Sequence, residues 1–466
     1  MIQDYNLSAI LKKSLSKGGD FAEIYFEQSL SNQIVCEQKQ IEKIVSGIDV
    51  GVGIRVLFKG QTAYGYTNDW SEQGLLSLAA RVSEAVEAKY FDRDFVLHSV
   101  KPSWKNSPSK NPSHFELKEK IIPVLKASDV AWKHNEYIQQ ATITYRDLEK
   151  KILIANSLGE LCEDEQIYTV FLTQVVAQKD GILQTGYEGV GGTLGFELFD
   201  EHCPEEVATT AAAQAYQMLH ARPAPAGSMP VVLAAEAGGT MVHEAVGHGL
   251  EADLAMEGLS VYQNKIGERV ASSLITVVDD KTLPYKRGSF VFDDEGSPAQ
   301  KTILIDQGIL KTYMHSRLYA EKAGVASTGN GRRESYKCRP IVRMTNTMIA
   351  SGKEDPQEII HSVEKGLYVK RMGGGQVNTV NGDFMFEVTE GYLLEKGKMG
   401  EAVRGATLTG NGPEILMQID KVGSDLGFGI GTCGKDGQGV PVADAQPTLR
   451  IPEIVVGGIA YTVPIK

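Results

Sequence analysis

The segment MVHEAVGHGLEAD, residues 241–253, holds two histidines and a glutamate of the kind that binds metal and hydrolyses peptides. The pattern is His243-Glu244-x-x-x-His248, one residue longer than the H-E-x-x-H motif of zinc peptidases. Zinc accepts neutral imidazole readily, and a glutamate next to the first histidine can serve as general base. The segment therefore predicts metal-dependent hydrolysis, and the alternative is a structural pair of histidines on a helix.

The extra residue in this motif has a geometric consequence. Each residue of an α-helix advances by about 100°, so an i,i+5 pair lies about 140° apart and cannot share one ion. His243 and His248 can face one metal only if the helix widens by one residue or ends between them. A π-type turn would do this, and we expect it at Val246-Gly247, where Gly247 and Gly249 reduce its backbone cost.

A catalytic zinc site needs a third protein ligand, and four residues are candidates. Glu251 and Asp253 are better placed to orient the histidines than to bind the ion. His315, in KTYMHSR, is equally well explained as a partly exposed polar residue. Cys433 lies in the glycine-rich stretch GFGIGTCGKDGQGVPV, which predicts an exposed and adaptable loop rather than core. The residues alone leave the third ligand open and favour Cys433.

Composition limits the classes of protein to which the chain can belong. It has 466 residues, 42% of them hydrophobic and 23% charged, as in ordinary globular proteins of several domains. The net charge of −12 argues against nucleic acid or an anionic membrane as a partner. We find no signal peptide and no apolar run long enough to span a membrane. The five scattered cysteines argue against a disulfide framework, and a cytoplasmic location fits best.

The elements before the motif are predicted to be mixed α and β. Helical spacing covers residues 4–17 and 72–89, and period-two alternation between Phe21 and Asn68 predicts antiparallel strands. After a Pro-, Ser- and Lys-rich linker at 100–113 the order recurs more loosely. The second set comprises helices at 114–127 and 203–219 and strands at 136–146, 150–156 and 165–177.

These patterns predict an α+β fold with three domains. Residues 1–110 and 111–225 form two units that each combine helices with an antiparallel meander, so the same architecture is expected to be used twice. Residues 226–466 form a β-rich domain that carries the metal helix. The prolines of ARPAPAGSMP, 221–230, mark the clearest boundary because proline fits neither a helix nor a central strand.

Five sequence blocks in the second half carry a family resemblance. They are HEAVGHGLEAD (243–253), FDDEGSPAQKTILIDQGIL (292–310), STGNGRRESY (327–336), GGGQVNTVNGDFMFEVTEGYLLEKGK (373–398) and GTCGKDGQGVPVADAQPTLR (431–450). They resemble the signature blocks of the TldD/PmbA family, and within it those of the TldD branch. The N-terminal half resembles that family only in architecture and length.

The resemblance implies a cytoplasmic zinc metallopeptidase. Carried over to this sequence, it makes His243, His248 and Cys433 the zinc ligands and Glu244 the catalytic base. It further implies cleavage of unfolded or short peptides, and assembly as a homodimer or as a heteromer with a TldE/PmbA-like paralogue. The competing hypothesis is a non-catalytic module that binds peptides or a partner and holds a structural metal.

Three further motifs have a functional and a structural interpretation. Asp293, Asp294 and Glu295 can bind a hard cation, but the glycine and proline that follow favour a polar turn. Arg332 and Arg333 can grip a peptide carboxylate or form salt bridges with the acidic blocks. The stretch GGGQVNTVNGDFMFEV can be an edge strand that pairs with an extended substrate or an ordinary core strand, which is slightly favoured.

Overall fold

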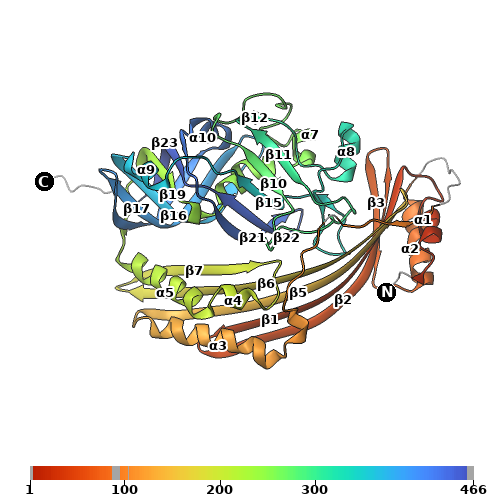
Figure 1. Ribbon diagram of the computed structural model, residues 1–466, viewed down its shortest axis with the longest axis horizontal. Coiled ribbons are helices and arrows are strands. Elements are labelled where there is room, and N and C mark those ends of the chain that lie inside the picture. Colours follow the sequence, from red (N-terminus) through yellow and green to blue (C-terminus); the bar gives the residue numbers. More distant parts are fainter. Residues whose placement is uncertain (1–3, 87–94, 103, 459–466) are drawn as a thin grey trace.

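The computed structural model describes residues 4–86, 95–102 and 104–458 and has an α+β fold. A long twisted sheet lies along one side of the molecule, and a β-rich body that contains the metal helix faces it (Figure 1). None of the described helices is long and apolar enough to cross a membrane.

The long sheet joins the strands of the first two predicted units. Its order is β3-β2-β1-β5-β6-β4, with β7 added beside β6. Its strands are β1 (Phe21–Glu37), β2 (Gln40–Phe58), β3 (Gln61–Thr67), β4 (His98–Ser99), β5 (Ile138–Asn156), β6 (Glu160–Lys179) and β7 (Ile182–Gly192). Because β1 pairs with β5 over Glu23–Glu37, the two units share one continuous sheet. The three-domain division of the chain remains a prediction.

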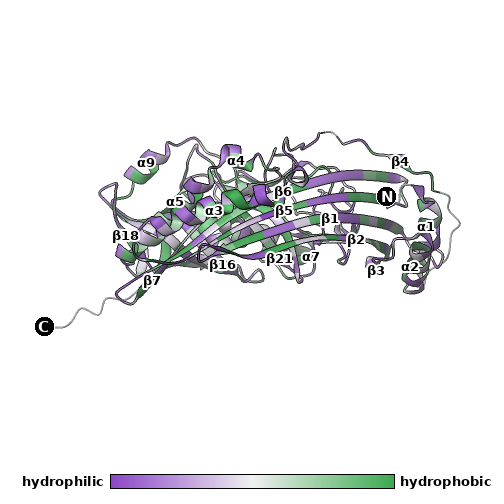
Figure 2. Ribbon diagram, turned by 90° about the horizontal axis from the view of Figure 1, so that it is seen from below, coloured by the Kyte–Doolittle hydropathy of each residue, from purple (hydrophilic) through white to green (hydrophobic). Residues whose placement is uncertain are grey.

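Helices cover parts of one sheet face at each end. They are α1 (Leu7–Ser14), α2 (Glu72–Glu84), α3 (Leu117–Lys133), α4 (Leu198–Glu201) and α5 (Pro204–His220), with a short 3₁₀ turn at Pro112–His114. The view from the helix side shows α3 and α5 lying across strands whose residues alternate in hydropathy (Figure 2). The predicted helix 72–89 ends at Glu84 among the described residues, and its last three positions lie outside them.

One sequence prediction in this half was wrong, and one strand was not predicted at all. The strands expected at 136–146 and 150–156 are one continuous strand, β5. No turn forms at its charged middle, because the charged side chains there are ion-paired: Asp147 with Lys120 at 2.6 Å, and Lys150 with Glu27 at 3.3 Å. Strand β7 was not predicted, since its glycines break the apolar pattern.

The C-terminal body contains two larger sheets and a two-stranded one. The six-stranded sheet runs β12-β11-β10-β15-β22-β21 and the other runs β16-β9-β23-β19-β17-β18-β8, with β20 beside β23. The strands of the first are β10 (Val277–Asp280), β11 (Lys301–Asp306), β12 (Ile309–Leu310), β15 (Asn346–Ile349), β21 (Gly427–Lys435) and β22 (Gln438–Gln446). Those of the second are β8 (Arg222–Pro223), β9 (Gly227–Leu233), β16 (Lys365–Val377), β17 (Asp383–Glu395), β18 (Lys398–Arg404), β19 (Ala406–Asn411), β20 (Lys421–Val422) and β23 (Leu449–Gly457). The two-stranded sheet pairs β13 (Gly331–Arg332) with β14 (Ile341–Val342), and the remaining helices are α6 (Thr240–Val242), α7 (Ala252–Met256), α8 (Arg317–Ala323), α9 (Pro356–His361) and α10 (Gly412–Gln418).

Strand β9 corrects the interpretation of the proline-rich boundary. Pro230 lies inside β9, which has β16 on one side and β23 on the other. It is tolerated because the pairing with β16 begins only at Val231 and the pairing with β23 is irregular between Ile451 and Ile454.

The helical segment 240–250, which carries His243 and His248 and is called the metal helix here, lies between the two larger sheets. An additional pairing of β16 with β17 closes β16, β9, β23, β19 and β17 into a ring, and the helix packs against this ring and against β15 and β22. Val242, Ala245 and Val246 belong to the same buried apolar cluster as Phe384 and Phe386 of β17. Burial of these residues fixes the axis of the helix and leaves its histidines facing β21.

Candidate metal centre

The helix widens where the motif requires it. After α6, residues His243–Gly247 form a π turn, and the His248 N–H donates to the carbonyl of His243, five residues earlier. A 3₁₀ turn at His248–Leu250 follows. The extra residue brings the two imidazoles to the same side, with ring centroids 5.0 Å apart. The predicted π turn is confirmed.

Gly247 matters for packing rather than for backbone freedom. Its φ of −56° is ordinary for a helix, so any residue could adopt it. A Cβ at this position would instead lie 2.0 Å from Sδ of Met344. Glycine thus allows the widened turn to pack closely on the segment that precedes β15.

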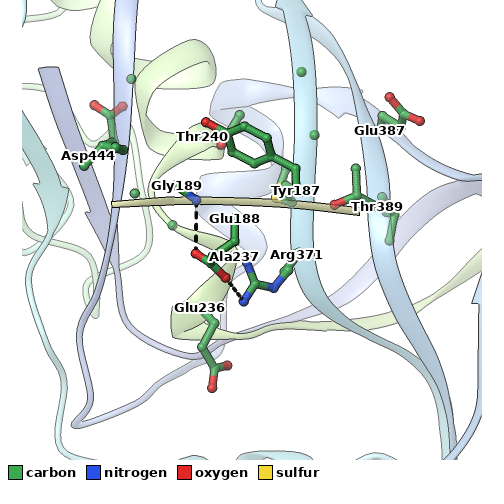
Figure 3. Close-up of a pocket in the computed structure, with 18 of the residues that line it drawn as sticks. Tyr187, Glu188, Gly189, Glu236, Ala237, Thr240, Arg371, Glu387, Thr389 and Asp444 are labelled. Carbon is green, nitrogen blue, oxygen red and sulfur yellow. Dashed lines mark hydrogen bonds and ion pairs between the residues drawn. The ribbon is translucent and has the colours of Figure 1, made fainter. Parts of the chain in front are cut away.

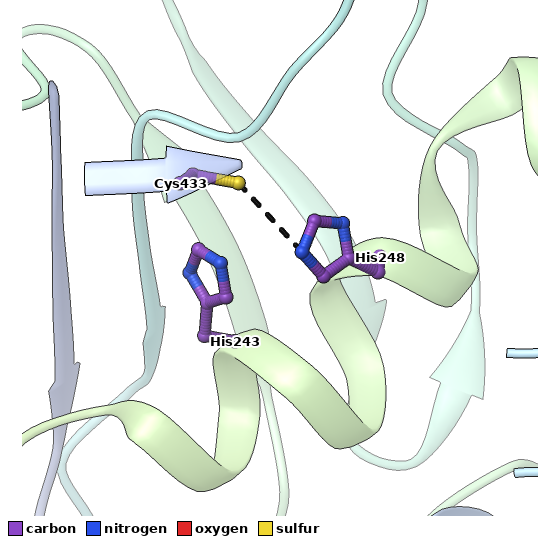
Figure 4. A group of neighbouring side chains, drawn as sticks. All are labelled: His243, His248 and Cys433. Atoms are coloured by element: carbon purple, nitrogen blue, oxygen red, sulfur yellow. Dashed lines mark hydrogen bonds between the residues drawn. The ribbon is translucent and has the colours of Figure 1, made fainter. Parts of the chain in front are cut away.

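Cys433 completes a group of three neighbouring side chains that could hold a metal ion (Figure 4). One donor atom from each of His243, His248 and Cys433 lies within 4.8 Å of the others, and Cys433 Sγ is 3.7 Å from His248 Nε2. Ligands at bond lengths of about 2.0–2.3 Å around a tetrahedral zinc lie roughly 3.3–3.8 Å apart. The three residues therefore fit a zinc ion with little movement.

The position of Cys433 differs from the prediction. It lies on strand β21 rather than in a loop, and its side chain is only 2% exposed. Its strand is a hairpin partner of β22, joined by the turn Asp436-Gly437, which explains the high glycine content without a flexible loop.

Each histidine is oriented by a carboxylate on its other nitrogen. His243 Nδ1 lies 2.8 Å from Asp444 Oδ1, and His248 Nδ1 lies 3.0 Å from Glu251 Oε2. A hydrogen bond at Nδ1 fixes the ring so that Nε2 faces a metal. Glu251 thus has the orienting position considered for it, whereas Asp253 pairs with Lys435 at 2.7 Å and forms no ion pair with a histidine among the described residues.

Asp444, which lies against the ring of His243, was not among the residues predicted from the sequence to belong to the site. It belongs to VADAQ in β22, where an acidic residue interrupts an apolar strand. That interruption was the available signal, but only the pairing of β21 with β22 shows that Asp444 lies near the helix.

The charges of the group favour a thiolate. Burial alone would keep the thiol neutral, but His243 and His248 lower the pKa of Cys433 to about 5. Burial opposes a charge on His248, yet Glu251 and Cys433 raise its pKa to about 10, and Asp444 and Cys433 likewise raise the pKa of His243. Without metal, the site therefore holds protons that a cation would displace.

Glu244 is the free carboxylate of the site. No hydrogen bond or ion pair with another described residue holds it, and burial raises its pKa. It lines a cavity of about 830 Å³ together with His243 and Cys433. Figure 3 shows the walls of this cavity, with Thr240 from the helix, Asp444 from β22 and Tyr187 from β7.

The other predicted site residues lie outside the group. His315 is buried with Nδ1 unpartnered, but it is not among the three clustered donors. Arg332 donates to the carbonyls of Met344 and Pro441. Arg333 is ion-paired with Glu23 at 2.6 Å, which favours the salt-bridge interpretation over carboxylate gripping.

The acidic block FDDEG forms a turn. Asp293 accepts hydrogen bonds from the backbone N–H groups of Glu295, Ser297 and Gly331. Glu295 pairs with Arg55 of the long sheet at 2.6 Å. The block therefore links the C-terminal body to the N-terminal sheet rather than to the metal group.

Three family models match successive parts of the chain. The PmbA/TldA metallopeptidase domain 1 matches residues 22–88, the central domain matches 110–219 and the C-terminal domain matches 226–458. The chain belongs to the TldD/PmbA family. The metal group lies within the segment that matches the C-terminal domain.

Relatives in this family are similar over nearly their full length. The metalloprotease TldD homolog of Haemophilus influenzae is 38% identical, and the alignment covers 94% of this chain and 93% of that protein. Among crystal structures, a Thermotoga maritima protein whose name refers to modulation of DNA gyrase has a TM-score of 0.79 at 22% identity, covering 94% and 96% of the two chains. TldE from Thermococcus kodakarensis has a TM-score of 0.75 at 18% identity, covering 97% and 99%. The structures establish the fold, and the names of the sequence relatives support a metallopeptidase.

The contact of Asp444 with His243 gives a testable prediction. Asp444→Asn should weaken zinc affinity about 10–100-fold, because loss of a partner that orients a ligand typically has this effect. Competition with a chromophoric chelator measures it. Asp436→Asn, in the exposed turn of the same hairpin, is the matched control and should bind zinc normally. Equal affinity in both variants would show that Asp444 does not support the site.

Proposed function

We propose that this chain is a zinc-dependent peptidase that cleaves unfolded or short peptides. His243, His248 and Cys433 hold the zinc ion and Glu244 is the general base. The observation that carries the proposal is the convergence of three donor atoms within 4.8 Å beside an unpaired carboxylate on one cavity wall. Two nitrogens and one thiolate suit zinc, whereas magnesium and calcium prefer oxygen.

The chain's own residues account for binding and proton transfer. When bound, zinc supplies a Lewis acid that polarises the scissile carbonyl and makes water easier to deprotonate. Glu244 accepts the proton of the attacking water and delivers it to the leaving amine. Its raised pKa suits both steps, since a general base works best when its pKa lies nearer the working pH. Asp444 and Glu251 keep the imidazoles aligned throughout.

The cavity walls suit an extended polypeptide. Strands β7 and β21 each pair on one side only among the described strands, and both line the cavity. The glycine-rich end of β16 pairs with β17 but not with β9, whose pairing stops at Val369. Exposed strand edges bind peptides through main-chain hydrogen bonds and need little sequence preference. Strand β17 is paired on both sides, so only the β16 part of the predicted edge strand is available.

The alternative, a binding module with a structural metal, fits less well. Structural zinc sites usually have four protein ligands, whereas this group offers three and faces a cavity. The fold similarity to TldE leads us to propose assembly as a homodimer or with a TldE/PmbA-like paralogue. We place this activity in the cytoplasm, where the thiol of Cys433 stays reduced.

Removal and return of metal tests the proposal. Chelation should abolish hydrolysis of an unstructured fluorogenic peptide, and about one equivalent of zinc per chain should restore it. Magnesium at the same concentration should not restore it, because the donor set contains no oxygen ligand. Full activity in the chelated protein, with zinc shown to be absent by elemental analysis, would refute the metal mechanism.

A further inference from the structure

A second cavity of about 600 Å³ continues from the metal-side cavity. The two share Tyr187 of β7 and residues 430–432 of β21. Strands rise about 3.3 Å per residue, so Gly431 lies about 7 Å along β21 from Cys433. The part of the second cavity that Gly431 lines therefore lies roughly two residues along the strand from Cys433.

Two arginines that line this second cavity have no acidic partner in the part of the chain that the structure describes. Arg287 donates from Nε to the Gly431 carbonyl at 3.1 Å and from Nη2 to Thr432 Oγ1 at 3.4 Å. Neither Arg287 nor Arg146 forms an ion pair with any described carboxylate. Two arginines without an ion pair are unexpected in a chain whose net charge is −12.

The carboxylates that line the same cavity are already engaged. Asp147 pairs with Lys120 at 2.6 Å and accepts from Asn32 at 2.7 Å. Glu334 accepts the backbone N–H of Gly439 at 2.8 Å. Neither carboxylate forms an ion pair with Arg287 or Arg146 among the residues that the structure describes.

Like charges crowd Arg287. Burial lowers the pKa of Arg287, and the positive charges of Arg332 and Arg146 lower it further. Arg332 itself donates to two backbone carbonyls and lies over the ring of Phe290, whose centroid is 5.4 Å from its guanidinium carbon. A guanidinium that is partly dehydrated and close to other positive charges is stabilised more by a bound anion than an exposed guanidinium is.

We propose that Arg287, assisted by Arg146, binds a carboxylate at the carboxyl end of the peptide substrate, about two residues beyond the scissile bond. The inference rests on the proposed peptidase function and names the substrate class: peptides that end in or carry an anion at this place. Arg332 and Arg333 were the residues first considered for binding a peptide carboxylate, but their donors face the protein interior. The proposal assigns this role instead to arginines that line the second cavity.

Binding of three labelled peptides tests the subsite without hydrolysis. The zinc-loaded Glu244→Gln protein is titrated with fluorescein-hexaalanine as the free acid, as the amide, and as an amide whose last residue is glutamate. We expect the free acid to bind about tenfold more tightly than the amide, as fits one charge-assisted contact. If the glutamate peptide binds as tightly as the free acid, the subsite accepts a side-chain carboxylate as well as a terminal one. If it binds only as weakly as the amide, the subsite is restricted to the terminal carboxylate.

Substitutions separate recognition from folding. Arg287→Gln and, independently, Arg146→Gln should reduce the preference for the free acid, and Arg287→Lys should retain part of it, because lysine keeps the charge but not the fork of donors. Zinc content must equal that of the parent protein. Lys353→Gln, an exposed cation outside both cavities, is the matched control.

Two outcomes have different meanings. Equal binding of all three peptides, or a preference that survives both arginine substitutions, would overturn the carboxylate subsite and leave the peptidase proposal intact. Arg287-dependent binding in a zinc-loaded wild-type protein that hydrolyses none of the peptides would support the subsite and overturn the peptidase.

Discussion

Glu244→Gln should leave zinc binding unchanged and lower peptide hydrolysis by about 10²–10⁴-fold, the usual contribution of a general base. The carboxylate is not one of the three clustered donors, and no described side chain depends on it for a hydrogen bond. Glutamine has nearly the same shape but cannot accept a proton, so the loss should appear in kcat with little change in KM.

The measurement combines elemental analysis with steady-state kinetics on an unstructured peptide. Glu268→Gln, at an exposed position outside the cavity, is the matched control and should behave as the parent. If Glu244→Gln keeps both its zinc and the parental rate, Glu244 is not the base. If it loses zinc, the carboxylate is a ligand and the assignment of Cys433 must be revised.

Cys433→Ser should weaken zinc affinity by more than about 100-fold, since loss of an outer partner alone typically costs about 10–100-fold. A serine hydroxyl is a hard, weakly acidic donor, whereas the two histidines hold Cys433 ready as a thiolate, a soft donor that zinc favours. Cobalt substitution gives a second readout, because sulfur-to-cobalt charge-transfer absorption should be present in the parent and absent in the variant.

Cys203→Ser, at an exposed cysteine, controls for loss of a thiol as such. Unchanged zinc affinity in Cys433→Ser would return the third position to Glu251 or His315. The structure disfavours both, because Glu251 is engaged by His248 and by Lys435, and His315 lies outside the donor group. Removal of the thiol therefore tests whether the widened helix and β21 build one site.

The sequence determined much of the fold, and the reason is local. Alternating and helical periodicities placed α1, α2, α3, α5 and the first strands close to their observed ranges, because these elements bury one face and expose the other. It failed where charged residues found partners across the sheet, as in the middle of β5, and where Pro230 fell at an irregularity of β9. Those outcomes depend on residues far away in the chain.

At the metal site, too, some features follow from the local sequence and others only from tertiary contacts. The types and spacing of His243, Glu244 and His248 by themselves predicted that the helix widens or ends between the histidines, since a regular α-helix cannot turn an i,i+5 pair toward one ion; the structure has the widened turn. Only tertiary structure brought Cys433 to 3.7 Å from His248 and Asp444 to 2.8 Å from His243. The β21–β22 hairpin aligns both residues with the helix, and a contact between segments about two hundred residues apart is set by packing, which no local pattern encodes.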